Sequence, residues 1–271
     1  MLLRVSSFAR IAEVNPNPTL PMTQRANRFL AAAAFAASLG TANAQNPPAP
    51  LTPPPRQPAW ETLASAGLTL TKGNSDTMLA NVGVTTAKKW TGNEIILGAN
   101  MTYGEASGVQ NVNNYNAFGQ YNRLFSDRIY GGLKLTAVKD DIANIDYRLS
   151  VSPLAGYYFI KDAATQLSAE TGPSYVIEGL GGVNRSYAGL RVGERFEHKF
   201  NDRAKLWQTA EFIPQVDRFS QYLLNFELGV DSAITQQVSL RAVLQDNYNS
   251  QPARGRKGND VRLITGIAYK F

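Results

Sequence analysis

The stretch that decides the fold is the carboxyl terminus, Arg262-Leu263-Ile264-Thr265-Gly266-Ile267-Ala268-Tyr269-Lys270-Phe271. Its two alternating registers are Leu263, Thr265, Ile267, Tyr269 and Phe271, and Arg262, Ile264, Gly266, Ala268 and Lys270. Successive side chains of a β-strand point to opposite faces. A strand with one apolar face and one polar or small face suits a wall with lipid outside and water or packed polar groups inside. We therefore expect a transmembrane strand here.

Strands of this kind recur from Trp60 onward. The alternation predicts twelve of them, at residues 61–72, 76–89, 94–105, 114–124, 128–138, 146–159, 164–177, 186–198, 204–216, 221–231, 237–248 and 260–271. An even number of strands leaves no open edge, which lipid would not tolerate. The predicted fold class is therefore an all-β, transmembrane, antiparallel up-and-down β-barrel of twelve strands, formed by residues 60–271.

The connections between these strands alternate in length. Short turns are expected at 91–93, 126–127, 161–163, 201–203 and 235–236, and longer segments at 105–113, 139–145, 178–185, 216–221 and 249–259, with a tight exception at 73–76. Outer-membrane barrels have short periplasmic turns and longer outer loops. Aromatic residues suggest the two interfaces: Trp60, Trp90, Phe125, Phe159, Phe196, Trp207 and Phe271 at periplasmic ends, and Tyr103, Tyr115, Tyr147, Tyr175, Tyr222 and Tyr248 at outer ends.

An export signal precedes the predicted barrel. Residues 22–44 combine a positive start at Arg25 and Arg28, an apolar run over 29–39 and an Ala-Asn-Ala cleavage site before Gln45. Residues 1–44 would then be an amino-terminal extension plus a cleaved signal peptide, and translation starts at either Met1 or Met22. Residues 45–59 form a Pro-rich linker, and the predicted location is the bacterial outer membrane.

Composition excludes several classes of function. The full chain has 27 Lys+Arg and 21 Asp+Glu residues; without residues 1–44 the net charge falls to about +3 (23 − 20). There is no clustered basic face of the kind that binds nucleic acid. No run of about 18 apolar residues exists, so a helical span is not expected. The chain has no cysteine, which is compatible with an oxidising periplasm.

Charged residues also occupy the inward register of the predicted strands. They are Glu94, Lys134, Arg148, Glu170, Arg191, Arg195, Glu211, Glu227, Arg241 and Arg262. A buried charge without a partner is costly, so we expect pairs across the wall. Either they fill the lumen as a salt-bridged plug, or they line a narrow aqueous path and tune its selectivity. Glu194 is an exception, because it falls on the apolar side.

No constellation predicts catalysis, a metal or a cofactor. His198 is the only histidine, and we expect it at a periplasmic strand end as a solvated or interfacial side chain. Asp140, Asp141 and Asp146 would suit calcium, but a loop of solvated acids is the preferred interpretation. Of the two Gly-Gly pairs, 131–132 is expected to relieve crowding in the wall and 181–182 to make a loop.

The last outer loop predicts a different kind of contact. Arg254, Arg256 and Lys257 suit phosphate groups, which lipopolysaccharide carries at that height. The expected partners are therefore outer-membrane lipid and lipopolysaccharide, together with the barrel-assembly machinery, which would meet the strand ending at Phe271 during biogenesis.

The segment from Ala66 to Thr77, with its core Gly73-Asn74-Ser75-Asp76-Thr77, resembles the opening motif of the YdiY-like family of salt-stress-induced outer-membrane proteins. The end of the chain, Asn259-Asp260 and then a strand closing on Tyr269-Lys270-Phe271, is also similar. The resemblance covers about residues 60–271. It implies an outer-membrane barrel and a link to osmotic or salt stress, and it supplies no catalytic residues.

Three functions are compatible with these features. The first is a narrow channel or envelope-stress component without catalytic activity. The second is a non-conducting structural or adhesion barrel that binds partners or lipopolysaccharide through its outer loops. The third, least favoured, is a lipid-modifying enzyme. The sequence does not name a solute.

Overall fold

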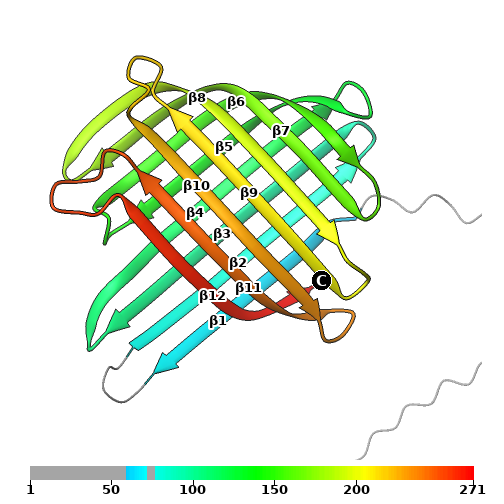
Figure 1. The fold of residues 1–271 in the computed structure, drawn as a ribbon, viewed down its shortest axis with the longest axis horizontal. Coiled ribbons are helices and arrows are strands. Elements are labelled where there is room, and N and C mark those ends of the chain that lie inside the picture. Colours follow the sequence, from blue (N-terminus) through cyan, green and yellow to red (C-terminus); the bar gives the residue numbers. More distant parts are fainter. Residues whose placement is uncertain (1–58, 72–76) are drawn as a thin grey trace, which may run out of the picture. The chain divides into compact units, whose positions relative to one another are not determined.

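The computed structural model describes residues 59–71 and 77–271, which form one closed barrel of twelve antiparallel strands (Figure 1). The strands are β1 (Glu61–Thr71), β2 (Thr77–Trp90), β3 (Asn93–Ala106), β4 (Val109–Leu124), β5 (Ile129–Asp140), β6 (Ile145–Lys161), β7 (Thr165–Leu180), β8 (Val183–Lys199), β9 (Ala204–Pro214), β10 (Tyr222–Ala233), β11 (Val238–Asn249) and β12 (Asn259–Lys270). Each strand lies beside its sequence neighbours, and β1 beside β12 closes the wall. The predicted fold is confirmed.

Several predictions fall on parts of the chain that the structure does not describe. The signal peptide and nearly all of the Pro-rich linker lie in residues 1–58, and Gly73, Asn74, Ser75 and Asp76 of the family motif lie in 72–76. Thr77, the last residue of that motif, opens β2. Within residues 59–71 and 77–271, no helix has the length and apolarity needed to cross a bilayer.

The strands form because their side chains alternate in polarity. On β3, Leu97 and Met101 face outward and are 40% and 42% exposed, whereas Glu94 and Thr102 face inward and are buried. The ladder keeps these registers in place: β2 and β3 pair along their whole length, from Thr77 opposite Ala106 to Trp90 opposite Asn93. A shift by one residue would exchange the two faces, so the apolar pattern fixes the register.

One end of the barrel, here called the turn end, carries only short connections of two to four residues, at 91–92, 125–128, 162–164, 200–203 and 234–237. The opposite end, the loop end, carries segments 141–144, 215–221 and 250–258, which are among the longer connections predicted from the sequence. Long loops at 105–113 and 178–185 were the wrong prediction. The residues there continue the strands, and the chain reverses within two residues.

Residues with positive φ, three of them glycines, form these two tight turns. Ser107 and Gly108 have φ of 52° and 75°, and Gly181 and Gly182 have φ of 60° and 79°. Two successive positive φ values define the hairpin turn that best matches the twist of paired strands. The Gly181-Gly182 pair therefore makes a tight turn rather than a loop. Of the other pair, Gly132 packs its backbone against the Tyr121 carbonyl and Asn122, where a Cβ would collide.

The 250–258 loop reaches across the loop end of the barrel. Ala253 is buried against Ile145 and Leu180, at the ends of β6 and β7. Arg256 donates a hydrogen bond to Asn144 Oδ1, at 3.1 Å, in the turn between β5 and β6. Because β11 and β12 are not neighbours of β5, β6 or β7 in the wall, these contacts carry the loop over the mouth of the lumen.

The aromatic side chains follow the predicted pattern with one exception. At the turn end, Tyr269 and Phe271 pack edge to face, and at the loop end Tyr222 stacks on Tyr248. Trp207 lies near the turn end, as predicted, but its ring faces the lumen and not the outer surface. Its ring lies over Gly229, which faces the lumen on β10, because glycine leaves room there for the flat ring.

The ladder between β6 and β7 has a gap in its middle. Regular pairing stops between Val151 opposite Tyr175 and Ala155 opposite Thr171, where Pro153 and Pro173 face each other. Proline has no N–H to donate to a ladder. On the lumen side, Ser152 Oγ donates instead to Ser174 Oγ at 2.9 Å. The interruption lies beside the most crowded level of the lumen.

Candidate functional site

The centre of the lumen is organised by one row of residues across three strands. Glu170 on β7 lies opposite Gly193 on β8, and Gly193 lies opposite Glu211 on β9. Because Gly193 has no side chain, the guanidinium of Arg191 lies over it, within 2.8 Å of where a Cβ would be. Arg191 donates to both carboxylates, to Glu170 at 2.9 Å and to Glu211 at 2.6 Å.

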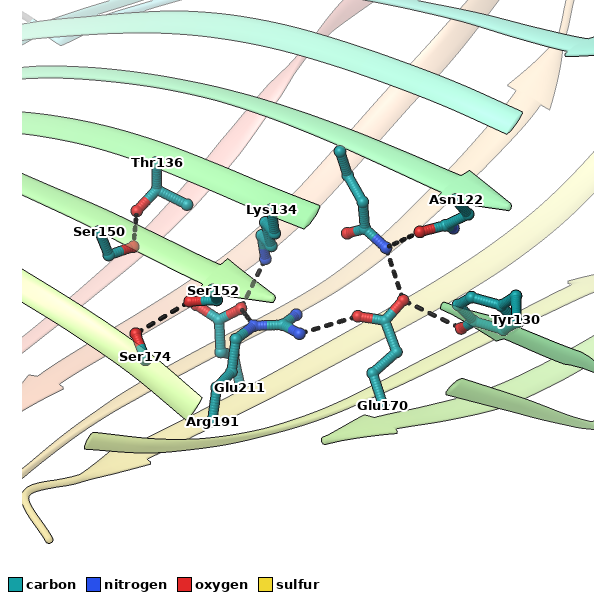
Figure 2. A network of polar contacts seen from close by, with 11 residues as sticks. Asn122, Tyr130, Lys134, Thr136, Ser150, Ser152, Glu170, Ser174, Arg191 and Glu211 are labelled. Carbon is teal, nitrogen blue, oxygen red and sulfur yellow. Dashed lines mark hydrogen bonds and ion pairs between the residues drawn. The ribbon is translucent and has the colours of Figure 1, made fainter. Parts of the chain in front are cut away.

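Side chains from β4 and β5 complete this cluster (Figure 2). Lys134 on β5 contacts Glu211 at 2.5 Å, and Gln120 on β4 donates to Glu170 at 2.6 Å. Tyr130 on β5 also donates to Glu170, at 3.0 Å. Lys134 and Glu211 lie four strands apart, so their contact crosses the lumen, whereas the Tyr130 ring reaches Glu170 over Gly156 of the intervening β6. We call the six residues the central constriction: Gln120, Tyr130, Lys134, Glu170, Arg191 and Glu211.

The central constriction is electrically balanced. Two cations face two carboxylates, and each carboxylate has at least two partners. Moving a charged group out of water costs free energy, and this cost is offset only when the ion pair has good geometry and further hydrogen bonds. The ion pairs of the central constriction meet both conditions. The side chains of Arg191 and Lys134 are 5% and 19% exposed. The cluster therefore narrows the lumen without giving it a net charge.

A second bridge crosses the lumen nearer the loop end. Arg262 on β12 contacts Asp140, at the end of β5, with Nη2 3.0 Å from Oδ2. Asn114 donates to the same oxygen at 2.9 Å, and the backbone N–H groups of Ile142 and Ala143 donate to the other. Asp140 was predicted to be a solvated loop acid, but it is only 3% exposed, because it both caps its turn and pairs across the barrel.

Glu178 forms the most deeply buried ion pair. It is fully buried between Arg148 and Arg185, each 2.5 Å from a different carboxylate oxygen. Sequence reasoning missed Glu178 and Arg185, because both were assigned to a loop at 178–185. The signal that could have found them was the continued alternation of β7 and β8 up to a Gly-Gly pair.

A fourth group lies towards the turn end. Arg241 and Asp231 form a two-bond pair, 2.7 Å at each contact, and the guanidinium lies 4.7 Å from the centre of the Trp207 ring. Trp207 Nε1 donates to Glu227 at 2.8 Å, and Gln245 donates to the other oxygen. In the opposite part of the lumen, Tyr158 on β6 donates to Glu94 on β3 at 2.8 Å.

One of the predicted lumen charges is exposed near the turn end. Arg195 lies four residues beyond Arg191 on the same face of β8, yet its side chain is 53% exposed against 5% for Arg191. Arg195 Nη2 lies 3.8 Å from Glu197 Oε2. Along this face of β8, exposure therefore falls steeply from Arg195 to Arg191, whereas Glu94, near the turn end of β3, is buried.

A polar hollow of about 380 Å³ lies at the loop end. Three segments meet there: the start of β8, the 215–221 loop and the 250–258 loop. The lining residues are Arg185, Ser186, Tyr187, Gln215, Asp217, Arg218, Gln221 and Gln251. The hollow thus lies at the loop end of the barrel, and the exposed Arg195 lies towards the turn end.

The structure brings eight of the ten predicted lumen charges into the four groups described above; Glu94 is bonded to Tyr158 instead, and Arg195 is exposed. It also gives Glu194 a partner on the outer face, because Gln208 donates to it at 3.1 Å. His198 lies on the same outer face between Phe196 and Phe200, with Thr165 Oγ1 2.9 Å from its Nδ1. No metal-binding group of three or more His, Cys, Asp or Glu residues occurs in the described part of the chain. Arg254 and Lys257 are exposed beside Arg256.

A closed antiparallel barrel with an apolar outer face and a charged lumen is a β-barrel of the outer-membrane type. The sequence matches the family described as "Protein of unknown function, DUF481" over residues 64–271, and the chain belongs to this family. No curated protein matches it at a significant level.

Two solved structures are similar to the barrel. The NanC porin shares 8% identity, with a TM-score of 0.50 over 78% of this chain and 100% of the porin. The KdgM porin in complex with disordered oligogalacturonate also shares 8% identity, with a TM-score of 0.45 over 78% of this chain and 99% of the porin. At this identity the likeness shows the fold alone.

Proposed function

We propose that the protein is a narrow outer-membrane channel for small hydrophilic solutes, without catalytic activity. In the orientation that we propose, the turn end of the barrel faces the periplasm and the loop end faces the outside of the cell. The observation that carries the proposal is the contrast between Arg195, which is 53% exposed, and Arg191, which is 5% exposed, on one face of β8. A wet lumen that narrows at a charged cluster is the arrangement expected of a selective pore.

The chemistry of the lumen also favours a channel over an inert plug. A buried ion pair is often no more stabilising than apolar side chains of similar size. A barrel that only had to be filled would therefore gain nothing from the charges of the central constriction. Long side chains held by ion pairs, such as Lys134 against Glu211, leave a path that can widen when a contact breaks.

The balanced charge of the central constriction supports selection by size rather than by charge. Two cations and two carboxylates face the same level of the lumen. A permeating ion of either sign meets a partner there. The polar hollow at the loop end and the exposed Arg195 would hydrate a solute on each side of this level.

Conductance of single barrels in planar bilayers tests the channel. Lys134→Ala removes the contact from β5, while Arg191 still neutralises Glu211. We expect small steps from the native protein and steps about twofold larger from the variant. Lys139→Ala is the matched control, because Lys139 is on the same strand but is paired with Asp141 near the loop end. No steps from either protein would reject the channel.

A second function is favoured by the 250–258 loop. It is anchored by Ala253 and presents the exposed cations Arg254 and Lys257 beside Arg256. A non-conducting barrel could bind lipopolysaccharide phosphates there. Replacement of all three cations with Ser should then weaken lipopolysaccharide binding at least tenfold, and unchanged binding would reject this role. A link to salt stress rests only on the family resemblance, and induction of the protein by salt would test it.

A further inference from the structure

The seam that closes the barrel is paired over only part of its length. β1 pairs with β2, and β12 with β11, through eleven residue pairs each. Against each other, β1 and β12 pair only at Leu63–Ala66 and Ile267–Lys270. Among the described residues, Gly67–Leu70 and Asn259–Gly266 have no strand partner on the seam side. The other eleven junctions of the wall are paired over eight residues or more.

Two glycines mark the point where the pairing stops. A Cβ on Gly67 would collide with the Thr265 carbonyl, and a Cβ on Gly266 would collide with the Ala66 carbonyl. The two backbones are therefore in direct contact, as only glycine allows. Beyond this contact the strands separate towards the loop end, as Figure 1 shows for β1 and β12.

The outward side chains that flank the unpaired part of the seam are exposed. Leu68 and Leu70 on β1 are 62% and 66% exposed, and Val261 and Leu263 on β12 are 59% and 62% exposed. Val82, which faces outward from the fully paired β2, is equally exposed, at 62%, so the missing pairing, and not the exposure, distinguishes this seam.

The two faces of this seam have opposite chemistry. Outside, a mainly apolar groove of about 500 Å³ begins at Leu68 and Thr265, where the pairing ends, and continues over β12 to Leu240 on β11 and Val230 on β10. Ser232 and Arg241 also line it. Inside, β2 and β3 present an amide and hydroxyl cluster, in which Asn81 Nδ2 donates to Thr102 Oγ1 at 2.8 Å. An apolar surface and a hydrogen-bonding surface therefore meet at an edge with unpaired backbone groups.

We propose that the unpaired part of the β1–β12 seam is a lateral route between the lumen and the membrane, and that its ligand is an amphiphile. The apolar chain lies along Leu68, Thr265 and Ile267, which line the groove. The head group bonds to the free backbone edges, which hydrocarbon alone would leave unsatisfied. A lone apolar ligand would not satisfy them, and a water-soluble one would not use the groove. The proposal rests on the membrane placement of the barrel, not on conduction.

A fluorescence experiment tests the route, and the absence of native cysteine makes it simple. Bimane is attached at Thr69→Cys, which faces the lumen beside the unpaired seam, and at Thr85→Cys, which faces the lumen from the paired part of β2. Leu70→Cys is the lipid-facing reference. In dioleoylphosphatidylcholine vesicles that contain a brominated-chain analogue, we expect quenching at 69 to be at least half of that at 70, and little quenching at 85. Equal, weak quenching at 69 and 85 would overturn the proposal.

A disulfide experiment tests the seam itself. If pairing continued from Ala66 opposite Ile267, Leu70 would lie opposite Leu263. We expect Ala66→Cys/Ile267→Cys to oxidise readily, and Leu70→Cys/Leu263→Cys not to. In a continuous ladder the two cysteine pairs would be of the same type. A difference in their oxidation therefore reports the distance between the strands. Ready oxidation of the second pair means a closed seam and overturns the proposal. Heat-modifiable gel migration verifies that each variant folds, and bilayer conductance remains an independent measurement.

Discussion

Arg262 and Asp140 are 122 positions apart in the chain, and their side chains meet across the lumen with Nη2 3.0 Å from Oδ2. The same carboxylate accepts hydrogen bonds from the backbone N–H groups of Ile142 and Ala143 in its own turn. Asp140 therefore stabilises a local hairpin and a contact that exists only once the barrel is closed. Its cation is supplied by the last strand to be made.

The first prediction is that Arg262→Met destabilises the barrel. Asp140 loses its cation but keeps Asn114 and two backbone donors, so the free energy of unfolding should fall by about 2–3 kcal/mol, below the full cost of breaking a buried pair. Reversible urea unfolding in lipid vesicles, followed by tryptophan fluorescence, measures this. Arg254→Met, in an exposed part of the 250–258 loop, should change it by less than about 0.5 kcal/mol. Equal effects of the two substitutions would contradict the prediction.

The second prediction concerns ion selectivity. Glu170→Gln keeps the shape of the central constriction and leaves Lys134 and Arg191 with only Glu211. One added unit of positive charge about 6 Å from a permeating ion is worth about 0.7 kcal/mol in water, or roughly threefold in preference for anions. The reversal potential in a salt gradient reports it. Glu197→Gln, near the exposed Arg195, is the control with a smaller expected shift, because its surroundings are better screened.

The strands were predictable from the sequence because lipid enforces a period of two. The twelve predicted segments correspond to β1–β12, and most bounds agree within three residues. The turns were less predictable. β4 begins at Val109 and not at 114, because the strand continues through Gln110, Asn111 and Asn113, whose polar side chains on both faces look like a loop in the sequence. The positive φ of Gly108 and Gly182 decides the true end of each hairpin.

The contacts of the lumen were predictable only in part. Alternation directs Lys134 and Glu211 inward, but it contains no information on which strands face each other across a closed barrel. The bridge between them depends on curvature and strand order. Trp207 was assigned to the wrong face because an interfacial ring and a lumen ring look alike in sequence. The side on which the ring lies is decided by Gly229 on the neighbouring strand β10. The sequence of one strand does not show which residue of the next strand lies beside Trp207.

The third prediction tests the turn between β7 and β8. Gly182 has a φ of 79° and open space around it, so only its backbone restricts substitution. Gly182→Val should lower the free energy of unfolding by about 1–2 kcal/mol, because a β-branched residue avoids positive φ. Gly182→Asn, which tolerates that region, should cost less than about 0.7 kcal/mol. Urea unfolding in vesicles distinguishes them, and an equal loss in both variants would contradict the assignment of the turn.

The fourth prediction follows from the Trp207 ring over Gly229. A side chain at Gly229 would overlap the ring, so Gly229→Val should displace it and break its hydrogen bond to Glu227. The expected loss is about 1–3 kcal/mol, as for other overpacked sites, with a red shift of tryptophan emission as the indole becomes solvated. Gly119→Val is the control: a Cβ there meets only a methyl group of Leu97, at 3.2 Å, and the tryptophan emission should not change. If Gly229→Val leaves the emission unchanged, Trp207 does not occupy this place in the lumen.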